Sequence, residues 1–142
     1  MLTTRPASLH DERRVLDLLG QLFERDVSAE PGRARSFRRM IEEPGRGMVL
    51  LAEEQGEVLG VISVSYNLAI RFDTCYAQIE ELVVDAAARG KQAGAVLVRA
   101  AMEEARRHGC EEIGLYPREE TRAFYEKLGF TYVGVELRQR LR

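Results

Sequence analysis

The stretch IEELVVDAAARGKQAG, residues 79–94, decides how the rest of the chain is arranged. It starts as an apolar run with two adjacent carboxylates, passes through small residues, and enters a basic, glycine-containing loop ahead of a helical pattern. A helix start leaves its first backbone N–H groups unpaired and carries about half a positive charge. The order strand, loop, helix therefore predicts an anion-binding site of the kind that holds a phosphate-bearing cosubstrate.

The residues after this stretch predict a helix that crosses between two parallel strands. From Arg89 the pattern is helical, and a strand is expected on each side of the helix, one ending at Val84 and one over 113–116. Such a crossover makes the two strands parallel. A further helix is expected over 119–128 and a last β-run over 130–137. The helix that follows Arg89 should pack closely on a sheet through small and apolar residues at spacings of three and four: Ala93, Val96, Leu97, Ala100, Ala101 and Ala105.

The residues before this stretch predict two helices and an antiparallel hairpin. A capping-box pattern at Ser8 and Asp11 starts the first helix, and Pro31 starts the second, which stops at Pro44 and Gly45. A Gln55-Gly56 turn joins the two β-runs of the hairpin. Together with a short strand at the N-terminus, these elements give a mixed α/β or α+β fold, with expected strands over 3–6, 48–53 and 58–67.

Size and composition narrow the class of protein. At 142 residues the chain fits one domain, and hydrophobic and charged shares of 45% and 31% are those of a soluble globular protein. The net charge of −2 gives no general attraction to nucleic acid. The N-terminus is polar and no apolar run approaches the length of a membrane span, about 20 residues, so we expect a cytoplasmic protein. Two cysteines, Cys75 and Cys110, lack metal-site spacing and are expected to be buried free thiols, with no metal bound.

Three glycine-loop chemistries compete for the sequence RGKQAG. A nucleotide-hydrolysing P-loop requires GxxxxGK[ST], but Asp85 stands at the first glycine position and Gln92 follows Lys91. A dinucleotide loop requires GxGxxG, whereas Gly90 and Gly94 lack a third glycine at that spacing. The form that remains is R-x-x-G-x-G/A between a strand and a helix.

In this form the chain resembles the GNAT superfamily of acyl-CoA-dependent N-acetyltransferases. The Arg-Pro-Ala start at Arg5, the hairpin, the LVVDAAARGKQAG turn and the REETRAFYEKLGF segment follow that superfamily's order. The resemblance implies a central mixed sheet of six to seven strands with about four helices, acetyl-CoA as cosubstrate, and an amine substrate that is a small molecule or a peptide. The final β-run, 131–137, offers an exposed sheet edge through which a homodimer could form.

The resemblance also implies which residues bind the cosubstrate. The backbone N–H groups near the helix start would cradle the pyrophosphate, and Gln92 departs from the family because a glycine usually stands there. A side chain at this position is accommodated if its φ stays negative. Backbone amides of the strand would align the pantetheine arm, and Arg118 replaces a common asparagine. The full set is Leu82, Val83, Val84, Arg89, Gly90, Lys91, Gln92, Ala93, Gly94, Ala95 and Arg118.

Acetyl transfer to an amine requires a neutral nucleophile, a stabilised oxyanion and a proton for the leaving thiolate. An amine with a pKa near 10.4 is neutral in about one molecule in 2,500 at pH 7, a deficit of about 4.6 kcal/mol that a base must help relieve. The resemblance implies Glu80 as that base, through water, and Glu81 as the partner of the substrate amine. Adjacent strand residues point to opposite faces unless a bulge intervenes, and structural ion pairs are the alternative role for both.

Tyr125 falls on the position whose phenol protonates the CoA thiolate in the resembled family. A phenol pKa near 10 and a thiol pKa near 8.5 make this transfer uphill by about 2 kcal/mol, and aromatic packing is the alternative role. The residues expected on the substrate side, each of which could instead be ordinary surface, are Tyr66, Arg71, Phe72, Asp73 and Tyr76. A ternary-complex N-acetyltransferase is thus the first hypothesis. Its rival is a non-catalytic acyl-CoA-binding or protein-interaction module, for which Gln92 is the best argument.

Overall fold

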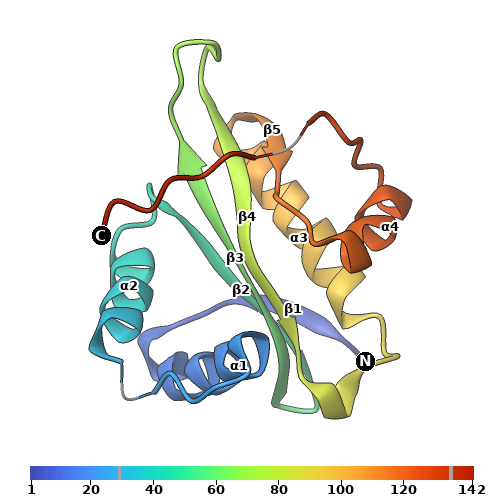
Figure 1. Ribbon diagram of the computed structural model, residues 1–142. Coiled ribbons are helices and arrows are strands. Elements are labelled where there is room, and N and C mark those ends of the chain that lie inside the picture. Colours follow the sequence, from blue (N-terminus) through green and yellow to red (C-terminus); the bar gives the residue numbers. More distant parts are fainter. Residues whose placement is uncertain (29, 135) are drawn as a thin grey trace.

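In the part of the chain that the computed structural model describes, residues 1–28, 30–134 and 136–142, five strands form one mixed sheet (Figure 1). The strands lie in the order of the sequence, and only the last pair is parallel. Their bounds are β1 Thr3–Pro6, β2 Gly47–Glu54, β3 Glu57–Asn67, β4 Cys75–Val84 and β5 Cys110–Gly114. The mixed sheet, the hairpin and the parallel crossover pair confirm the sequence-based expectation.

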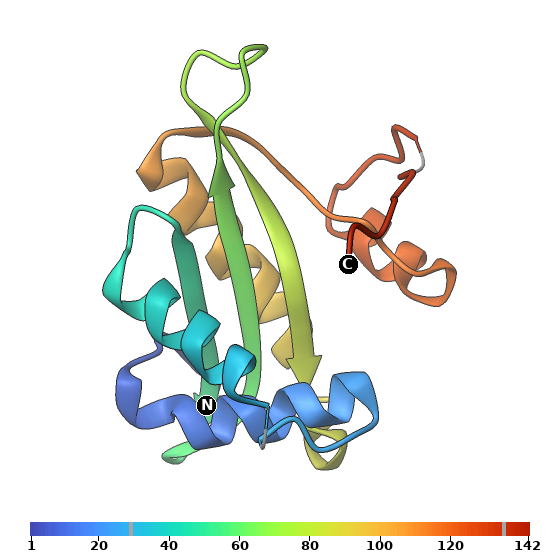
Figure 2. The same cartoon turned by 60° about the vertical axis from the view of Figure 1, so that its left-hand side comes forward.

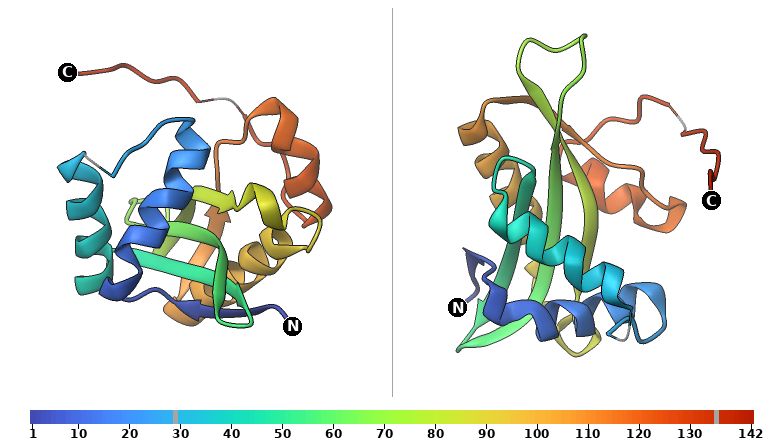
Figure 3. Two further views of the ribbon diagram at one scale, coloured as in Figure 1. Left: turned by 90° about the horizontal axis from the view of Figure 1, so that it is seen from below. Right: turned by 90° about the vertical axis from the view of Figure 1, so that its left-hand side faces the viewer.

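Helices cover both faces of this sheet, which makes three layers (Figures 2 and 3). On one face α1 (Glu12–Phe23) and α2 (Pro31–Glu42) pack Val15, Leu18 and Phe37 against alternate residues of β2 and β3. On the other face α3 (Ala93–His108) packs Leu97, Val98 and Ala101 against the sheet, and α4 (Glu119–Lys127) adds Tyr125 to the same core. The two 3₁₀ turns are η1 (Leu9–Asp11) and η2 (Ala86–Ala88). Burial on both faces explains why residues 48–52 of β2 are all apolar and do not alternate.

The parallel strands β4 and β5 are joined only at one end. Their register pairs are Cys75 with Cys110, Ala77 with Ile113, and Gln78 with Gly114. After Gln78, β4 pairs with β3 on one side and has no strand partner among the described residues on the other. Alternate backbone amides of residues 79–84 therefore face a gap that widens between β4 and the chain beyond β5.

Two expectations about the C-terminal part are wrong. The strand after α3 begins at Cys110 and ends at Gly114, so it lies earlier than the expected 113–116. No strand forms over residues 130–134 or 136–142, and the sheet described therefore has five strands instead of six to seven. The alternating pattern of this tail is apolar enough for a strand, but a strand also requires a neighbouring edge to pair with. The unpaired tail leaves Val133, Leu137 and Leu141 more than nine-tenths exposed.

The long helix also starts later than expected. It begins at Ala93, four residues after Arg89, because Gly90 and Gln92 both adopt positive φ angles that a helix does not contain. No helix in the described ranges is both long enough and apolar enough to cross a membrane.

Candidate active site

The two candidate carboxylates lie on one face of the sheet because β4 contains a bulge. The register between β3 and β4 shifts after Ser63, which pairs with Glu81, and leaves Glu80 without a register partner. Ser63 Oγ donates a hydrogen bond to Glu81, and Ser65 Oγ donates one to Glu80 Oε2 at 2.7 Å. Ser63 and Ser65 are two positions apart and share a face, so both carboxylates face the α1 and α2 layer.

The environments of the two carboxylates differ. Glu81 is half-buried, and burial raises the pKa of its carboxyl above the usual range, with the Ser63 hydroxyl opposing and the Glu80 charge adding to the rise. The Glu81 backbone N–H also donates to Ser63 Oγ at 3.1 Å, which fixes the pair. Glu80 is exposed. A raised pKa suits a general base that works near neutral pH.

A cavity of about 260 Å³ opens beside Glu81, between the two N-terminal helices and the sheet. Its polar lining consists of a carboxylate, a guanidinium and two hydroxyls, from Glu81, Arg33, Ser36 and Ser63. The Arg33 charge lies close enough to Glu81 to lower the pKa of its carboxyl, a smaller effect than that of burial. Phe23, Phe37 and Met40 are among its apolar walls. The cavity can therefore hold a molecule with a cationic end, an anionic end and an apolar surface.

The turn after β4 is anchored by Asp85. Its carboxylate accepts a hydrogen bond from the Ala87 backbone N–H at 3.0 Å and another from Arg14 Nη2 of α1 at 2.6 Å. Gln21 Oε1, also on α1, accepts a hydrogen bond from the Ala86 N–H at 3.0 Å. These contacts hold η2 and position the loop that follows it.

The start of α3 leaves backbone amides free at the place where the sequence predicts an anion cradle. The first helical hydrogen bond runs from the Val96 N–H to the Gln92 carbonyl oxygen at 3.1 Å, so the amides of residues 93–95 have no acceptor within the helix. Arg89 and Lys91 are exposed beside them. These groups fit a pyrophosphate, to which free amides and a helix dipole are well suited.

Two contacts tune this cradle. Lys91 Nζ pairs with Glu54 Oε1 at 2.9 Å on the surface, an exchangeable contact that leaves the ammonium available to a phosphate. A Cβ added to Gly94 would lie 3.3 Å from Cζ of Phe124, so the missing side chain lets α4 approach the start of α3. Gly94 therefore serves both the cradle and the packing of α4.

Gln92 adopts the backbone conformation of the glycine it replaces. Its φ is 68° and its ψ is 13°, in the left-handed region, so the negative φ that would accommodate a side chain is not adopted. An L-residue pays about 1–2 kcal/mol for this conformation. Its exposed side chain also lies directly before the backbone amides of residues 93–95, which would face a phosphate.

Replacing Gln92 by Gly should raise the free energy of unfolding by about 1 kcal/mol, because glycine adopts a positive φ without the Cβ clash. It should also lower the Kd for CoA. Urea unfolding and calorimetric titration with CoA measure the two effects. Gln92→Ala is the matched control, since it shortens the side chain but keeps the Cβ and should not gain stability. If the Gly variant were no more stable than the Ala variant, the backbone of Gln92 would not be strained.

Tyr125 lies on the opposite side of the sheet from the carboxylates. Its ring is 8% exposed, packs in the α3 core, and meets Phe124 and Phe130 edge to face at centroid distances of 5.0 and 5.6 Å. Burial raises the pKa of its phenol to about 12. The structure therefore does not bring Tyr125 and Glu81 into one cavity.

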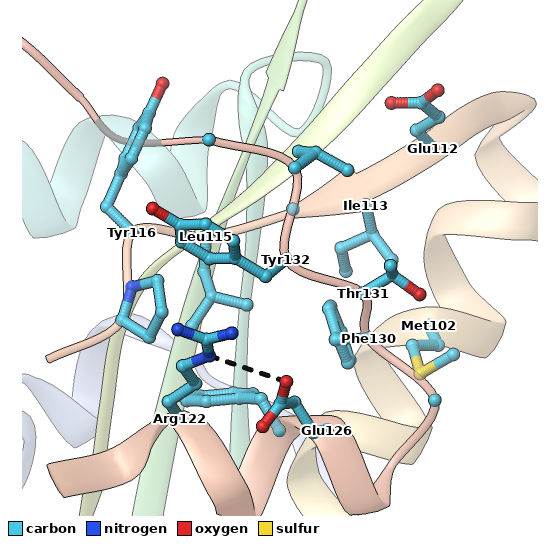
Figure 4. Close-up of a pocket in the computed structure, with 16 residues that line it drawn as sticks. Met102, Glu112, Ile113, Leu115, Tyr116, Arg122, Glu126, Phe130, Thr131 and Tyr132 are labelled. Atoms are coloured by element: carbon cyan, nitrogen blue, oxygen red, sulfur yellow. Dashed lines mark hydrogen bonds and ion pairs between the residues drawn. The ribbon is translucent and has the colours of Figure 1, made fainter. Parts of the chain in front are cut away.

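Tyr125 lines a separate cavity of about 370 Å³ between β5, α4 and the tail. Figure 4 shows this cavity, with Tyr116 and Tyr132 at its upper rim and Arg122 below them. Arg122 pairs with Glu126 at 3.4 Å and places its guanidinium carbon 4.2 Å from the centre of the Tyr132 ring. The lining of this cavity therefore includes both apolar walls and an ion pair.

The other predicted substrate residues are not in the Glu81 cavity. Tyr66 stacks on His108 at a centroid distance of 3.9 Å and lines a different cavity near the end of α3. Arg71, Phe72 and Tyr76 do meet one another in the β3–β4 hairpin, where the Arg71 guanidinium lies 4.8 and 5.2 Å from the two rings. Arg118 is the exposed N-cap residue of α4.

Sequence reasoning missed Ser63, Ser65 and Arg33. The two serines were visible as polar residues that share one face of an otherwise apolar strand, which is the pattern of side chains that orient a buried polar group. Arg33 sits among four arginines of α2, and that run looks like an ordinary solvated face. Only the packing of α2 against β2 and α1 brings it to the cavity that contains a carboxylate.

The fold combines a bulged strand that carries two carboxylates, a parallel neighbour that splays away from it, and a helix start with free backbone amides. A sequence profile of the Acetyltransferase (GNAT) family matches residues 13–130. The chain belongs to this family, which transfers an acetyl group from acetyl-CoA to an amine.

Similar proteins support the assignment in detail. Glucosamine 6-phosphate N-acetyltransferase 1 of Oryza sativa subsp. japonica is 32% identical over 138 residues, covering 94% of this chain and 83% of that protein. The crystal structure of glucosamine-6-phosphate N-acetyltransferase from Arabidopsis thaliana has a TM-score of 0.85 and 25% identity, covering 100% and 99% of the two chains. A transcriptional regulator from Bacillus halodurans C-125 shares the fold, with a TM-score of 0.87 and 24% identity, covering 99% and 100%.

The chain is therefore an enzyme, an N-acetyltransferase, and the rival hypothesis of a non-catalytic module is not supported. Within the described residues no group of three or more histidine, cysteine or acidic side chains is arranged to hold a metal ion.

Proposed function

We propose that the enzyme acetylates the amino group of a phosphorylated amino sugar, with glucosamine 6-phosphate as the first candidate. The observation that carries the proposal is the pairing of Glu81 with Arg33 in one cavity, which matches a substrate with an ammonium and an anion at its two ends. The proteins of rice and Arabidopsis named above support the choice, because the similarity extends over nearly the whole chain.

The proposed orientation follows from charge. The substrate amine approaches Glu81, and the phosphate lies toward Arg33 at the rim of the cavity, where its guanidinium can form charge-assisted hydrogen bonds. Within residues 1–28, 30–134 and 136–142, the ion pair of Arg33 is a surface one with Glu30 at 3.6 Å, so Arg33 can turn to the phosphate at little cost. The C–H face of a sugar ring suits the aromatic walls from Phe23 and Phe37.

We further propose that Glu81 is the general base, the role that the family resemblance gives to Glu80. Glu81 is the half-buried member with the raised pKa, and the Ser63 hydroxyl and its own backbone N–H fix its orientation. Glu80 is exposed and bonded to Ser65, which suits a residue that attracts and orients the cationic amine. The amine then attacks the thioester directly, and the backbone amides of residues 82–84 that face the gap support the developing oxyanion.

The test of the acceptor is release of free CoA thiol from acetyl-CoA with glucosamine 6-phosphate, glucosamine, polyamines and peptide amines. Glucosamine 6-phosphate should have the highest kcat/KM. Arg33→Ala should raise the KM for glucosamine 6-phosphate by about 10-fold, since one charge-assisted hydrogen bond contributes about 1.5–3 kcal/mol, and should leave glucosamine almost unaffected.

Arg35→Ala is the matched control, because this arginine lies on the same helix and is exposed. It should keep the wild-type KM for both sugars. Equal losses for the phosphorylated and unphosphorylated sugar in Arg33→Ala would sink the phosphate role. A peptide or polyamine that outperforms both sugars would refute the proposed acceptor class while leaving the acetyltransferase activity in place.

A further inference from the structure

The narrow end of the β4–β5 gap carries both cysteines of the chain. Cys75 is the first residue of β4, Cys110 is the first residue of β5, and the two are partners in the parallel register. Register partners in a parallel pair point to the same face of the sheet. Their Sγ atoms lie 3.0 Å apart, and both cysteines are free and half-buried.

The backbone around the two thiols already meets the requirements of a covalent link. Neighbouring strands are about 4.8 Å apart, which lies within the Cα separations of about 4.4–6.8 Å that disulfides span. Next to the pair, Thr74 Oγ1 donates to the Gly109 carbonyl oxygen at 2.7 Å, and the Thr74 N–H donates to Glu111 Oε2 at 2.8 Å. These two bonds hold the strand starts together, so a link requires a small movement of two side chains and no rearrangement of the sheet.

We propose that Cys75 and Cys110 form a reversible cross-strand disulfide in the presence of a low-molecular-weight disulfide such as oxidised glutathione. The link would staple β4 to β5 at the point from which the gap between them widens. It closes a loop that contains the whole of α3 and the anion cradle, between residues 35 apart in sequence. Neither cysteine is used by the proposed acetyl transfer.

The exchange proceeds in two balanced steps. The thiolate of one cysteine attacks a sulfur of oxidised glutathione, which forms a mixed disulfide and releases one glutathione thiolate. The other cysteine then attacks the protein sulfur of the mixed disulfide and releases the second glutathione. The protein loses two electrons and two protons, and one oxidised glutathione becomes two reduced ones.

The environment indicates which cysteine reacts second. Burial and the neighbouring Cys75 raise the pKa of Cys110 to about 12, so Cys110 is a poor first nucleophile. Once Cys75 carries glutathione, Cys110 lies beside the bond to be attacked.

The proposal is tested by equilibrating the full chain with oxidised glutathione and mapping thiols by alkylation and mass spectrometry. We expect both thiols to disappear, the mass to fall by two hydrogen atoms, and one cross-linked peptide to join residues 75 and 110. Tm should rise by about 10 °C, because closing a loop of this length removes unfolded-state entropy, and dithiothreitol should reverse the rise.

Cys75→Ser and Cys110→Ser are the matched controls, since each keeps one thiol and almost the same volume. Neither should show the rise in Tm on oxidation. Separate glutathione adducts on both cysteines, a link between two chains, or two thiols that survive oxidation in the wild type would each overturn the proposal. These outcomes do not depend on which amine the enzyme acetylates.

Discussion

Glu81→Gln should lower kcat by about 10³-fold, within the range that a positioned general base contributes. The amide keeps the shape of the side chain and can still accept a hydrogen bond from Ser63, but it cannot remove a proton. Steady-state kinetics with acetyl-CoA and glucosamine 6-phosphate measure the loss. The Kd for CoA should stay near the wild-type value, because the cradle at residues 89–95 is separate from the carboxylate cavity.

Glu80→Gln is the control, because it changes the neighbouring carboxylate in the same way. It should raise the KM of the amine and reduce kcat by much less than Glu81→Gln. The two variants separate the two role assignments directly. If Glu80→Gln caused the larger loss in kcat, the base would be Glu80 and Glu81 would be the amine partner, as the family resemblance first implied.

The pH profile gives a second, independent reading of the base. A base is active when deprotonated, so kcat must fall as pH decreases through its pKa. Burial raises the pKa of Glu81 above the ordinary glutamate value of 4.5. The acid limb of the wild-type profile should therefore lie at a higher pH than an ordinary carboxyl group would give. In Glu81→Gln this limb should vanish, and only the ionisation of the substrate amine should shape the profile. A limb at the same pH in both enzymes would assign it to another group.

The sequence was enough to predict the mixed sheet, its helices and the order of these elements along the chain. Periodicity placed the hairpin, the crossover and the helices, and the stretch from Ile79 to Gly94 forms a strand, a turn and a helix start in the predicted order. Local patterns suffice there because each element buries its own apolar face against the sheet. The assigned family followed from motifs that local sequence already contains.

The parts that sequence did not predict depend on register and on pairing. Alternation of a regular strand separates Glu80 from Glu81, whereas the bulge opposite Ser63 places both on one face. The sequence pattern does not show that Gln92 adopts the left-handed conformation of the glycine it replaces. The tail after Phe130 has the composition of a strand, but its pairing depends on a neighbour that local sequence does not specify.

Tyr125 is a weaker acid than a sequence match suggests, because its phenol is buried. With a pKa of about 12 for its phenol and about 8.5 for an ordinary thiol, the two values differ by about 3.5, which corresponds to about 5 kcal/mol against complete proton transfer. A hydrogen bond that strengthens as charge develops on the sulfur avoids most of this cost. We therefore propose that Tyr125 acts by donating a hydrogen bond to the departing thiolate, and that water supplies the proton afterwards.

Tyr125→Phe should accordingly lower kcat by about 10²-fold, the lower end of the range for general acids, while the Kd for CoA and the Tm stay near their wild-type values. The ring and its edge-to-face contacts with Phe124 and Phe130 are kept, so the packing contribution remains. Tyr116→Phe is the matched control, because Tyr116 lines the same cavity with a ring that is 56% exposed. It should keep full activity. A Tyr125→Phe enzyme with wild-type kcat would make this tyrosine a packing residue and leave water as the donor to the thiolate.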